Sequence, residues 1–349
     1  MTTPEAREQA VLEAVRERRE LVNEAITEEL PVERPERLYE ASRYLLDAGG
    51  KRLRPSVLLT AAEALADVEP LSEAYRSFPV PGEGSFDVMA AAVSVEVIQS
   101  FTLIHDDIMD DDDLRRGVPA VHEAYDLETA ILAGDTLYSK AFEIMLETGA
   151  EADRTVEALD ILANTCTQIC EGQALDVDFE SRTDVTPEEY LEMVEQKTAV
   201  LYAASAALPA VLMGADEETV DALYGYGLDV GRAFQIQDDV LDLTVPSDQL
   251  GKQRGSDLVE NKQTLITVHA RGQGVAVDDL VDADDVDTVT EAEVDEAVAA
   301  LERSGSIEYA NEMARDLVSR GKARLDVLPD NEAHDLLLEL ADYLIERGY

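Results

Sequence analysis

The stretch LIHDDIMDDDDLRRG, residues 103–117, ends one of the most apolar segments of the chain. Apolar residues fill the preceding positions without the strict alternation of a half-buried strand, which predicts a helix over about 87–110. Asp106 and Asp110 are four residues apart, so their carboxylates would share one face of this helix. The polar run that follows predicts that the helix ends close to the aspartates.

A second cluster, FQIQDDVLD at residues 234–242, repeats this arrangement. Asp238 and Asp242 are again four residues apart, and Pro246 disfavours helical geometry just beyond them. A carboxylate at a helix C-terminus costs about 0.3–1 kcal/mol because the helix dipole is negative there. A bound cation would offset this cost. Mg²⁺ binds through one or two carboxylates together with substrate phosphates, so the two clusters predict Mg²⁺ on either side of a diphosphate.

The rest of the chain shows amphipathic or buried helical patterns separated by short breakers, which predicts an all-α fold. A polar segment at 69–84 is expected to be a surface loop. Further helices are expected at about 5–30, from about 55, and at about 126–148, 151–176, 187–214, 216–244 and 308–325, with another at the C-terminus.

Because the motifs must converge on one pocket, we expect a single large helical bundle over residues 1–349 with a central cavity. Its parts would be a motif-bearing core at about 40–270, an acidic connector at about 272–290 and C-terminal helices at about 308–349.

The net charge is −48, from 76 acidic and 28 basic residues. Nucleic-acid binding needs a basic surface, so that class of function is excluded. Repulsion within so acidic a surface is mostly screened near 1 M salt, where the Debye length is about 3 Å. We therefore expect a halophilic source with a salty cytoplasm. The chain lacks an apolar run of the roughly 20 residues that span a bilayer, and its polar N-terminus is unlike a secretory signal, which predicts a cytoplasmic protein without a membrane span.

The chain has only six lysines, and a compact ammonium suits phosphate binding. Four lie in basic motifs: Lys51 in GGKRLRP (49–55), Lys197 before Thr198, Lys252 in GKQRGSDL and Lys262 in ENKQT. Arg54 and the Arg115–Arg116 pair add further positive charge. With the aspartates, these residues predict one metal-bridged diphosphate site and one purely basic site, the latter formed by Lys51, Arg54 and Arg116.

The motifs GGKRLRP, HDDIMDDDDLRRGVPAVH, Lys197–Thr198, FQIQDDVLD and GSDLVENKQT resemble, in order and spacing, those of the trans-isoprenyl diphosphate synthase family over about residues 40–270. The resemblance implies an all-α homodimer and a prenyltransferase that condenses isopentenyl diphosphate with dimethylallyl, geranyl or farnesyl diphosphate. Mg²⁺, at three ions per active site, would assist ionisation of the allylic diphosphate. The isopentenyl double bond would then attack the allylic cation, and a proton would be lost.

The same resemblance implies a role for each matching residue. Asp106, Asp110 and Asp238 would bind Mg²⁺, and Asp107, Asp239 and Asp242 would orient or bridge through water. Lys51, Arg54, Gln99 and Arg116 match the isopentenyl diphosphate site, and Arg115, Lys197, Lys252 and Lys262 match contacts to the allylic diphosphate. Thr198 and Gln235 match groups beside the forming carbocation, and Gln173 and Asp176 resemble a supporting motif. Asn261 replaces the usual Gly before the last lysine and tolerates the same left-handed geometry.

Phe101 and Thr102 bear on product length. Phe101 is five residues before Asp106, about 7.5 Å along a helix at 1.5 Å per residue, and its ring could form a floor under the growing tail. An aromatic residue on a buried helix could also simply pack in the core. An aromatic at this position, followed by a small residue, resembles archaeal geranylgeranyl (C20) synthases, so C20 is the expected product.

Several alternatives remain open. A farnesyl diphosphate synthase, a bifunctional farnesyl/geranylgeranyl synthase or a C25 synthase would differ from a C20 synthase only in the residues that form the floor under the growing tail. A terpene cyclase would need neither GGKRLRP nor a second aspartate cluster. A non-catalytic helical partner subunit would be expected to lose one cluster, whereas both are present here.

Overall fold

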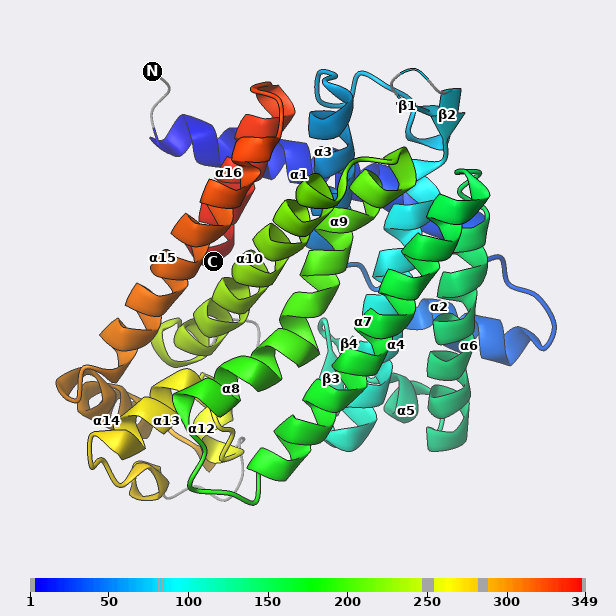
Figure 1. Ribbon diagram of the computed structural model, residues 1–349. Coiled ribbons are helices and arrows are strands. Elements are labelled where there is room, and N and C mark those ends of the chain that lie inside the picture. The colour runs from blue at the N-terminus through cyan, green and yellow to red at the C-terminus, as the bar shows by residue number, and fades with distance from the viewer. Residues whose placement is uncertain (1–3, 81, 83, 247–253, 282–287, 347–349) are drawn as a thin grey trace. The chain divides into compact units, whose positions relative to one another are not determined.

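The computed structural model describes residues 4–80, 82, 84–246, 254–281 and 288–346. Helices dominate these residues, and their strands form two short hairpins, which confirms the all-α class (Figure 1). The chain divides into two compact units. Unit 1 comprises Met1–Cys166, Ala204–Tyr224 and Leu325–Leu340, and unit 2 comprises Thr167–Ala203, Gly225–Arg324 and Ala341–Tyr349. The expected organisation as one domain stays a prediction.

The helix α4 (Val88–Met109) forms the centre of unit 1. It packs against α1 (Pro4–Glu29), α3 (Leu53–Ala66) and α6 (Leu127–Leu146) (Figure 1). Every residue from Val88 to Ile98 is buried. The expectation that the chain lacks an apolar run long enough to span a bilayer was wrong for α4, which is the one such helix among the described residues. However, 78% of its most apolar 18 residues are buried inside the fold. Packing against three helices accounts for its apolar sequence.

Unit 1 also has shorter elements. They are α2 (Glu36–Asp47), α5 (Val121–Ala124), the 3-10 helix Tyr75–Ser77, the hairpin β1–β2 (Phe78–Val80, Gly84–Phe86), the hairpin β3–β4 (Leu114–Arg115, Val118–Pro119) and the 3-10 helix Leu325–Val327. Of these, α2, α5 and the 3-10 helix Tyr75–Ser77 pack against α4. Unit 1 also contains the first part of α7 (Ala152–Phe179), the last part of α9 (Val200–Met213), the first turns of α10 (Glu217–Thr244) and most of α16 (Glu332–Glu346).

Unit 2 contains the second aspartate cluster on the remaining part of α10. Its other elements are α8 (Pro187–Val194), a π-helical turn (Glu195–Ala199), α12 (Ser256–Val259), α13 (Leu265–Gly272), the 3-10 helix Val277–Asp279, α14 (Glu291–Arg303) and α15 (Ser306–Arg324). The helix α13 packs against α8, α14 and α15. Capping boxes begin α8 at Thr186, α13 at Thr264 and α14 at Thr290, which explains where these helices start.

The structure confirms the long predicted helices within a few residues at each end. The sequence patterns did not predict α2, α13 or α14. The segment 69–84 was expected to be a plain surface loop, and this was wrong, because Tyr75 and Phe78 are buried and Phe78 pairs with Phe86 in a hairpin. Of the expected connector at 272–290, residues 282–287 lie outside the described part, and Val277–Asp279 form a 3-10 turn.

Candidate active site

The first aspartate cluster lies at the end of α4. The helix ends at Met109, and the Asp110 main-chain nitrogen donates a 2.9 Å hydrogen bond to the Asp106 carbonyl oxygen. Asp111 then has φ 55°, a left-handed geometry that stops the helix. Asp106 and Asp110 are partly exposed, whereas Asp107 is buried. The predicted helix end is therefore confirmed, and both predicted metal-binding carboxylates lie at it.

Arg115 lies in the tight hairpin β3–β4 and binds the buried Asp107 of α4. The turn residues Arg116 and Gly117 have φ of 54° and 76°, the pair of left-handed geometries that a two-residue turn of this kind needs. Arg115 Nε lies 2.6 Å from Asp107 Oδ1, and the same guanidinium donates to Asp112 at 2.7 Å. Burial raises the pKa of Asp107 to about 6, although the charge of Arg115 partly lowers it. The hairpin thus places a guanidinium beside the cluster.

Arg116 contacts the Gly-rich motif at 49–55. Its guanidinium donates hydrogen bonds to the carbonyl oxygens of Gly49 and Leu45. A Cβ at Gly50, whose φ is 148°, would lie 3.0 Å from Arg116 Cζ, so the glycine permits this close approach. Burial lowers the pKa of Arg116, and the nearby charge of Glu96 partly raises it. The structure therefore brings two parts of the predicted basic site together.

Arg52 was not singled out from the sequence, yet it holds the Gly-rich motif in place. Its buried side chain pairs with Glu96, donates to Asn23 Oδ1 at 2.9 Å and donates to the Leu46 carbonyl oxygen at 2.7 Å. With this anchor, the neighbouring Lys51 is exposed. The only sequence signal was its position within GGKRLRP, which does not distinguish a buried anchor from a ligand-binding arginine.

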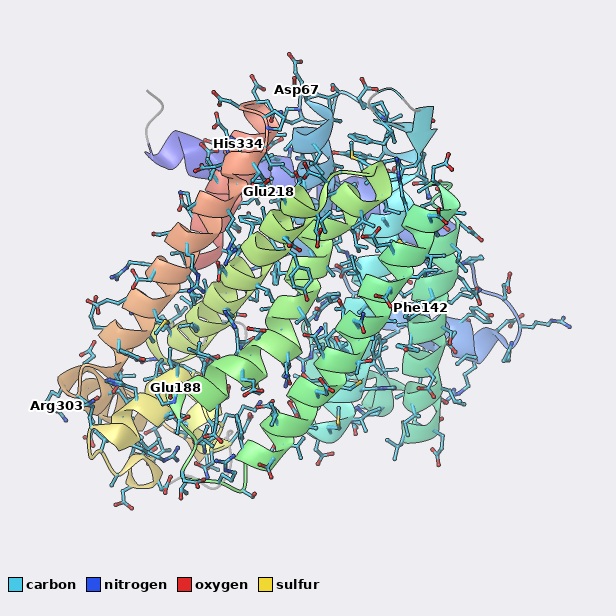
Figure 2. All side chains as sticks on the ribbon, viewed as in Figure 1. Asp67, Phe142, Glu188, Glu218, Arg303 and His334 are labelled. Carbon is cyan, nitrogen blue, oxygen red and sulfur yellow. The ribbon has the colours of Figure 1, made fainter. Side chains whose placement is uncertain are left out.

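Phe101 lies in a row of aromatic rings between α4 and α6. It is 6% exposed, and its ring centroid lies 5.3 Å from that of Tyr138 and 5.9 Å from that of His105. The ring centroid of Tyr138 lies 5.2 Å from that of Phe142, another residue of α6, which is labelled in Figure 2. Thr102 bonds to the Gln99 carbonyl oxygen at 2.8 Å, so its hydroxyl is used within α4. The predicted floor residue is thus part of a larger aromatic group.

In unit 2, Asp239 of the second cluster receives two hydrogen bonds. The Tyr190 hydroxyl donates to its Oδ2 at 2.5 Å, and Gln235 Nε2 donates to its Oδ1 at 3.0 Å. Burial raises the pKa of Asp239 well above its usual value, and the Asp257 charge adds to the shift. Thr198 Oγ1 donates to Gln235 Oε1 at 3.1 Å, so the two residues expected beside the carbocation are in contact. Tyr190 was not predicted, because its position on α8 carries no motif.

Asp242 is buried and fixes the chain that follows the cluster. Ser256 Oγ donates to its Oδ1 at 3.0 Å, and the main-chain nitrogen of Asp257 donates to its Oδ2 at 3.3 Å. The Gly255 nitrogen donates to the Asp242 carbonyl oxygen at 2.9 Å. Asp238, on the same helix, is partly exposed. Asp242 therefore anchors the GSDL segment.

Lys197 and Thr198 lie within the π-helical turn Glu195–Ala199. Lys197 Nζ donates to Asp176 Oδ2 at 2.6 Å, which joins the predicted allylic lysine to the supporting motif on α7. In the same motif Gln173 Nε2 is buried and lacks a hydrogen-bond acceptor among the described residues. The EGQALD motif and the Lys–Thr pair thus lie together.

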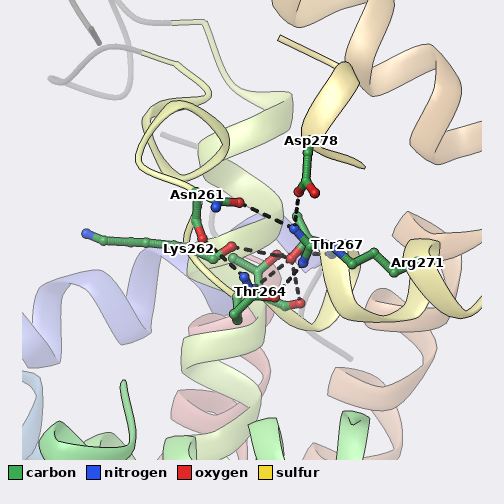
Figure 3. Close-up of polar contacts among 7 residues, drawn as sticks. Asn261, Lys262, Thr264, Thr267, Arg271 and Asp278 are labelled. Carbon is green, nitrogen blue, oxygen red and sulfur yellow. Dashed lines mark hydrogen bonds and ion pairs between the residues drawn. The ribbon is translucent and has the colours of Figure 1, made fainter. Parts of the chain in front are cut away.

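Lys262 extends away from the polar cluster that holds its loop (Figure 3). It forms an ion pair with Glu260 at 2.8 Å. Asn261 has φ 56°, which confirms that it takes the left-handed geometry expected there. Arg271 fixes the loop through Asn261 Oδ1 at 3.3 Å and Asp278 at 2.6 Å. Lys252, the other predicted allylic contact in this region, lies outside the described residues.

Residues 35–301 match the polyprenyl synthetase family model, and the chain belongs to this family. It is 73% identical over 337 residues to a geranylfarnesyl diphosphate synthase of Natronomonas pharaonis, covering 96% of this chain and 97% of that protein. The fold is similar to a geranylgeranyl pyrophosphate synthetase of Geoglobus acetivorans, with 43% identity, a TM-score of 0.84 and 95% and 99% of the two chains covered. It is also similar to a polyprenyl synthase of Caulobacter crescentus complexed with calcium and isoprenyl diphosphate, with 31% identity, a TM-score of 0.80 and 97% and 98% coverage.

These relationships establish the class of enzyme. The chain is a prenyltransferase of the short-chain prenyl diphosphate synthase type. The family resemblance inferred from the motifs is confirmed, including its archaeal affinity. The roles of the individual site residues stay predictions.

Proposed function

We propose that this enzyme condenses isopentenyl diphosphate with allylic diphosphates up to the C25 product, geranylfarnesyl diphosphate. The observation that carries the proposal is the 73% identity, over nearly the full length of both chains, to a protein named for that product. The C20 product expected from the sequence rested on Phe101 and Thr102 alone. A geranylgeranyl synthetase at 43% identity supports C20 less strongly than the nearer relative supports C25.

The chemistry would be electrostatic. Arg115, which is bonded to Asp107 in unit 1, and Lys197, which is bonded to Asp176 in unit 2, would each supply positive charge to the departing allylic diphosphate. The joined side chains of Thr198 and Gln235 would present oxygen dipoles to the developing allylic cation. Arg116 and the exposed Lys51, next to the Gly pair, would bind isopentenyl diphosphate. The released diphosphate is the expected acceptor of the final proton.

The aspartates fit a divalent cation by the chemistry of their donor atoms. Asp106, Asp110 and Asp238 offer carboxylate oxygens and are all partly exposed, which suits a hard ion that keeps some of its water. When bound, Mg²⁺ would neutralise charge on the departing diphosphate. The calcium in the Caulobacter complex supports a divalent ion in this family. We also propose a homodimer, working in a salty cytoplasm.

The aromatic row is compatible with a product longer than C20 if its rings can move. Phe101 is buried, but Tyr138, which supports its edge, is 40% exposed. An exposed ring can change rotamer at lower cost than a packed one. Movement of Tyr138 would let the Phe101 ring shift and admit one more five-carbon unit.

The test is incubation with labelled isopentenyl diphosphate and each allylic starter in turn, followed by chromatography of the dephosphorylated prenyl alcohols. The proposal predicts that C25 accumulates from every starter. Accumulation of C20 with only traces of C25 would restore the geranylgeranyl product, and release of C15 would favour the farnesyl alternative.

A further inference from the structure

The π-helical turn Glu195–Ala199 interrupts an otherwise α-helical path from α8 into α9 (Figure 1). A π-turn contains one residue more than the α-helical turn it replaces, and such turns are rare and frequently lie at functional sites. Return to α-helical geometry would rotate the side chains beyond it by about 100°, the angle per residue of a helix with 3.6 residues per turn. The orientation of Lys197 and Thr198 therefore depends on the turn being kept.

Two glycines from neighbouring helices pack directly on the main chain of this turn. A Cβ at Gly172 of α7 would lie 2.3 Å from the Lys197 nitrogen, and a Cβ at Gly231 of α10 would lie 2.6 Å from Ala199 Cα. Both obstacles are main-chain atoms, which cannot move aside as a flexible side chain can. The glycines set how closely α7 and α10 approach the turn, but they supply no attractive interaction that favours it.

An ion pair supplies that interaction. Arg232 of α10 pairs with Glu195, the first residue of the turn. Their side chains are only 24% and 31% exposed, so the pair is partly desolvated. Burial, followed by the charges of Arg320 and Arg324, lowers the pKa of Arg232. Those two arginines are themselves bound to the buried Asp229. A carboxylate partner therefore matters more for Arg232 than for an exposed arginine.

Arg232 and the predicted site lie along one helix. Gln235 follows Arg232 by three residues and accepts a hydrogen bond from Thr198, and Asp239 follows Gln235 by four residues and receives the Tyr190 hydroxyl. The helix α10 thus contacts the turn at its first residue through Arg232, at Ala199 through Gly231 and at Thr198 through Gln235.

The geometry points to Arg232 as a positioning residue for allylic diphosphate binding. Through Glu195 it holds the π-turn that directs Lys197 toward Asp176 and Thr198 toward Gln235. This inference rests on the proposed function, since the allylic diphosphate is the ligand that Lys197 would contact. Isopentenyl diphosphate, bound by residues of unit 1, would be little affected.

The experiment compares Arg232→Ala, Arg232→Lys and the charge swap Glu195→Arg/Arg232→Glu with the wild-type enzyme. In Arg232→Ala, the KM for farnesyl diphosphate should rise about tenfold, equivalent to about 1.4 kcal/mol, while the KM for isopentenyl diphosphate changes less than about twofold. In the lysine variant and in the charge swap, the rise in the logarithm of the KM for farnesyl diphosphate should be at most half of the rise in Arg232→Ala. Arg315→Ala, which removes an exposed pair with Glu308 at 3.2 Å in the same unit, is the matched control and should leave both KM values unchanged.

Binding of the unreactive analogue farnesyl thiolodiphosphate, measured by calorimetry, provides a readout that does not need turnover. Its Kd should rise by the same factor in Arg232→Ala. An equal rise of both KM values, or a lowered melting temperature with unchanged KM and Kd, would overturn the positioning role. If the wild-type enzyme binds the analogue but forms no prenyl product, the proposed function fails while the effect of Arg232 on binding can still be read.

Discussion

Tyr190 and Asp239 are joined by a 2.5 Å hydrogen bond from the tyrosine hydroxyl to the carboxylate Oδ2, and both side chains are buried. Tyr190 begins no recognisable motif and lies 49 residues before Asp239. It nevertheless restrains the carboxylate of Asp239, which directly follows the predicted metal ligand Asp238. The bond links α8, the helix that leads into the π-turn, to α10.

Tyr190→Phe removes this donor while keeping the ring. A buried hydrogen bond contributes about 0.5–1.5 kcal/mol, so kcat/KM for the allylic substrate should fall by up to about tenfold. The phenyl ring fills the same space, but the buried Asp239 oxygen loses its donor, which costs about 1–3 kcal/mol and should lower the melting temperature by a few degrees. Tyr309→Phe removes a hydroxyl from a ring that stacks on His269 and should leave kcat/KM intact. Equal kcat/KM in the two variants would show that the Tyr190 bond has no functional part.

Asp106→Ala and Asp238→Ala should each lower turnover by several orders of magnitude while the protein stays folded, as circular dichroism would show. The expected loss follows from removing one oxygen ligand from a bound cation. Asp113→Ala, which removes an exposed carboxylate next to the first cluster, is the control. Near-normal turnover in Asp106→Ala or Asp238→Ala would remove that residue from the metal site.

Phe101→Ala should shift the product distribution to longer chains, because the ring would no longer close the space beneath the first cluster. Replacing a buried Phe by Ala costs about 3–5 kcal/mol, so Phe101→Leu is the second variant and should show the same shift to a smaller degree. Tyr138→Ala tests the neighbouring ring at lower cost to stability. Chromatography of the prenyl alcohols is the measurement, and an unchanged distribution in all three variants would identify these rings as core packing alone.

The net charge of −48 predicts that the folded enzyme needs salt. Raising KCl from about 0.1 M to about 1 M shortens the Debye length from about 10 Å to about 3 Å and should raise the melting temperature by screening repulsion among carboxylates. Differential scanning calorimetry across this range is the check. Full activity and an unchanged melting temperature in dilute buffer would contradict a salt-adapted surface.

Much of the fold followed from local patterns. The long apolar run of α4, the aspartate clusters near helix ends and the left-handed Asn261 were predictable, because each depends on neighbours in the chain. The anchors were not predictable. Arg52 and Tyr190 act through partners 44 and 49 residues away, and nothing in their immediate sequence specifies those partners. The same holds for the π-turn, whose neighbours are the glycines of α7 and α10 and Arg232, which pairs with Glu195 from 37 residues away.

A single elongation step from C20 to C25 distinguishes the two product lengths without ambiguity. The purified enzyme is given Mg²⁺, labelled isopentenyl diphosphate and excess geranylgeranyl diphosphate in high-salt buffer, and the dephosphorylated product is separated by chain length. Labelled C25 prenyl alcohol is the expected result. If geranylgeranyl diphosphate gives no labelled C25 alcohol while parallel incubations with dimethylallyl, geranyl or farnesyl diphosphate give labelled C15 or C20 alcohols, the C25 assignment is contradicted. If label enters no prenyl alcohol from any of these four starters, the assignment of the enzyme as an active prenyl diphosphate synthase is contradicted.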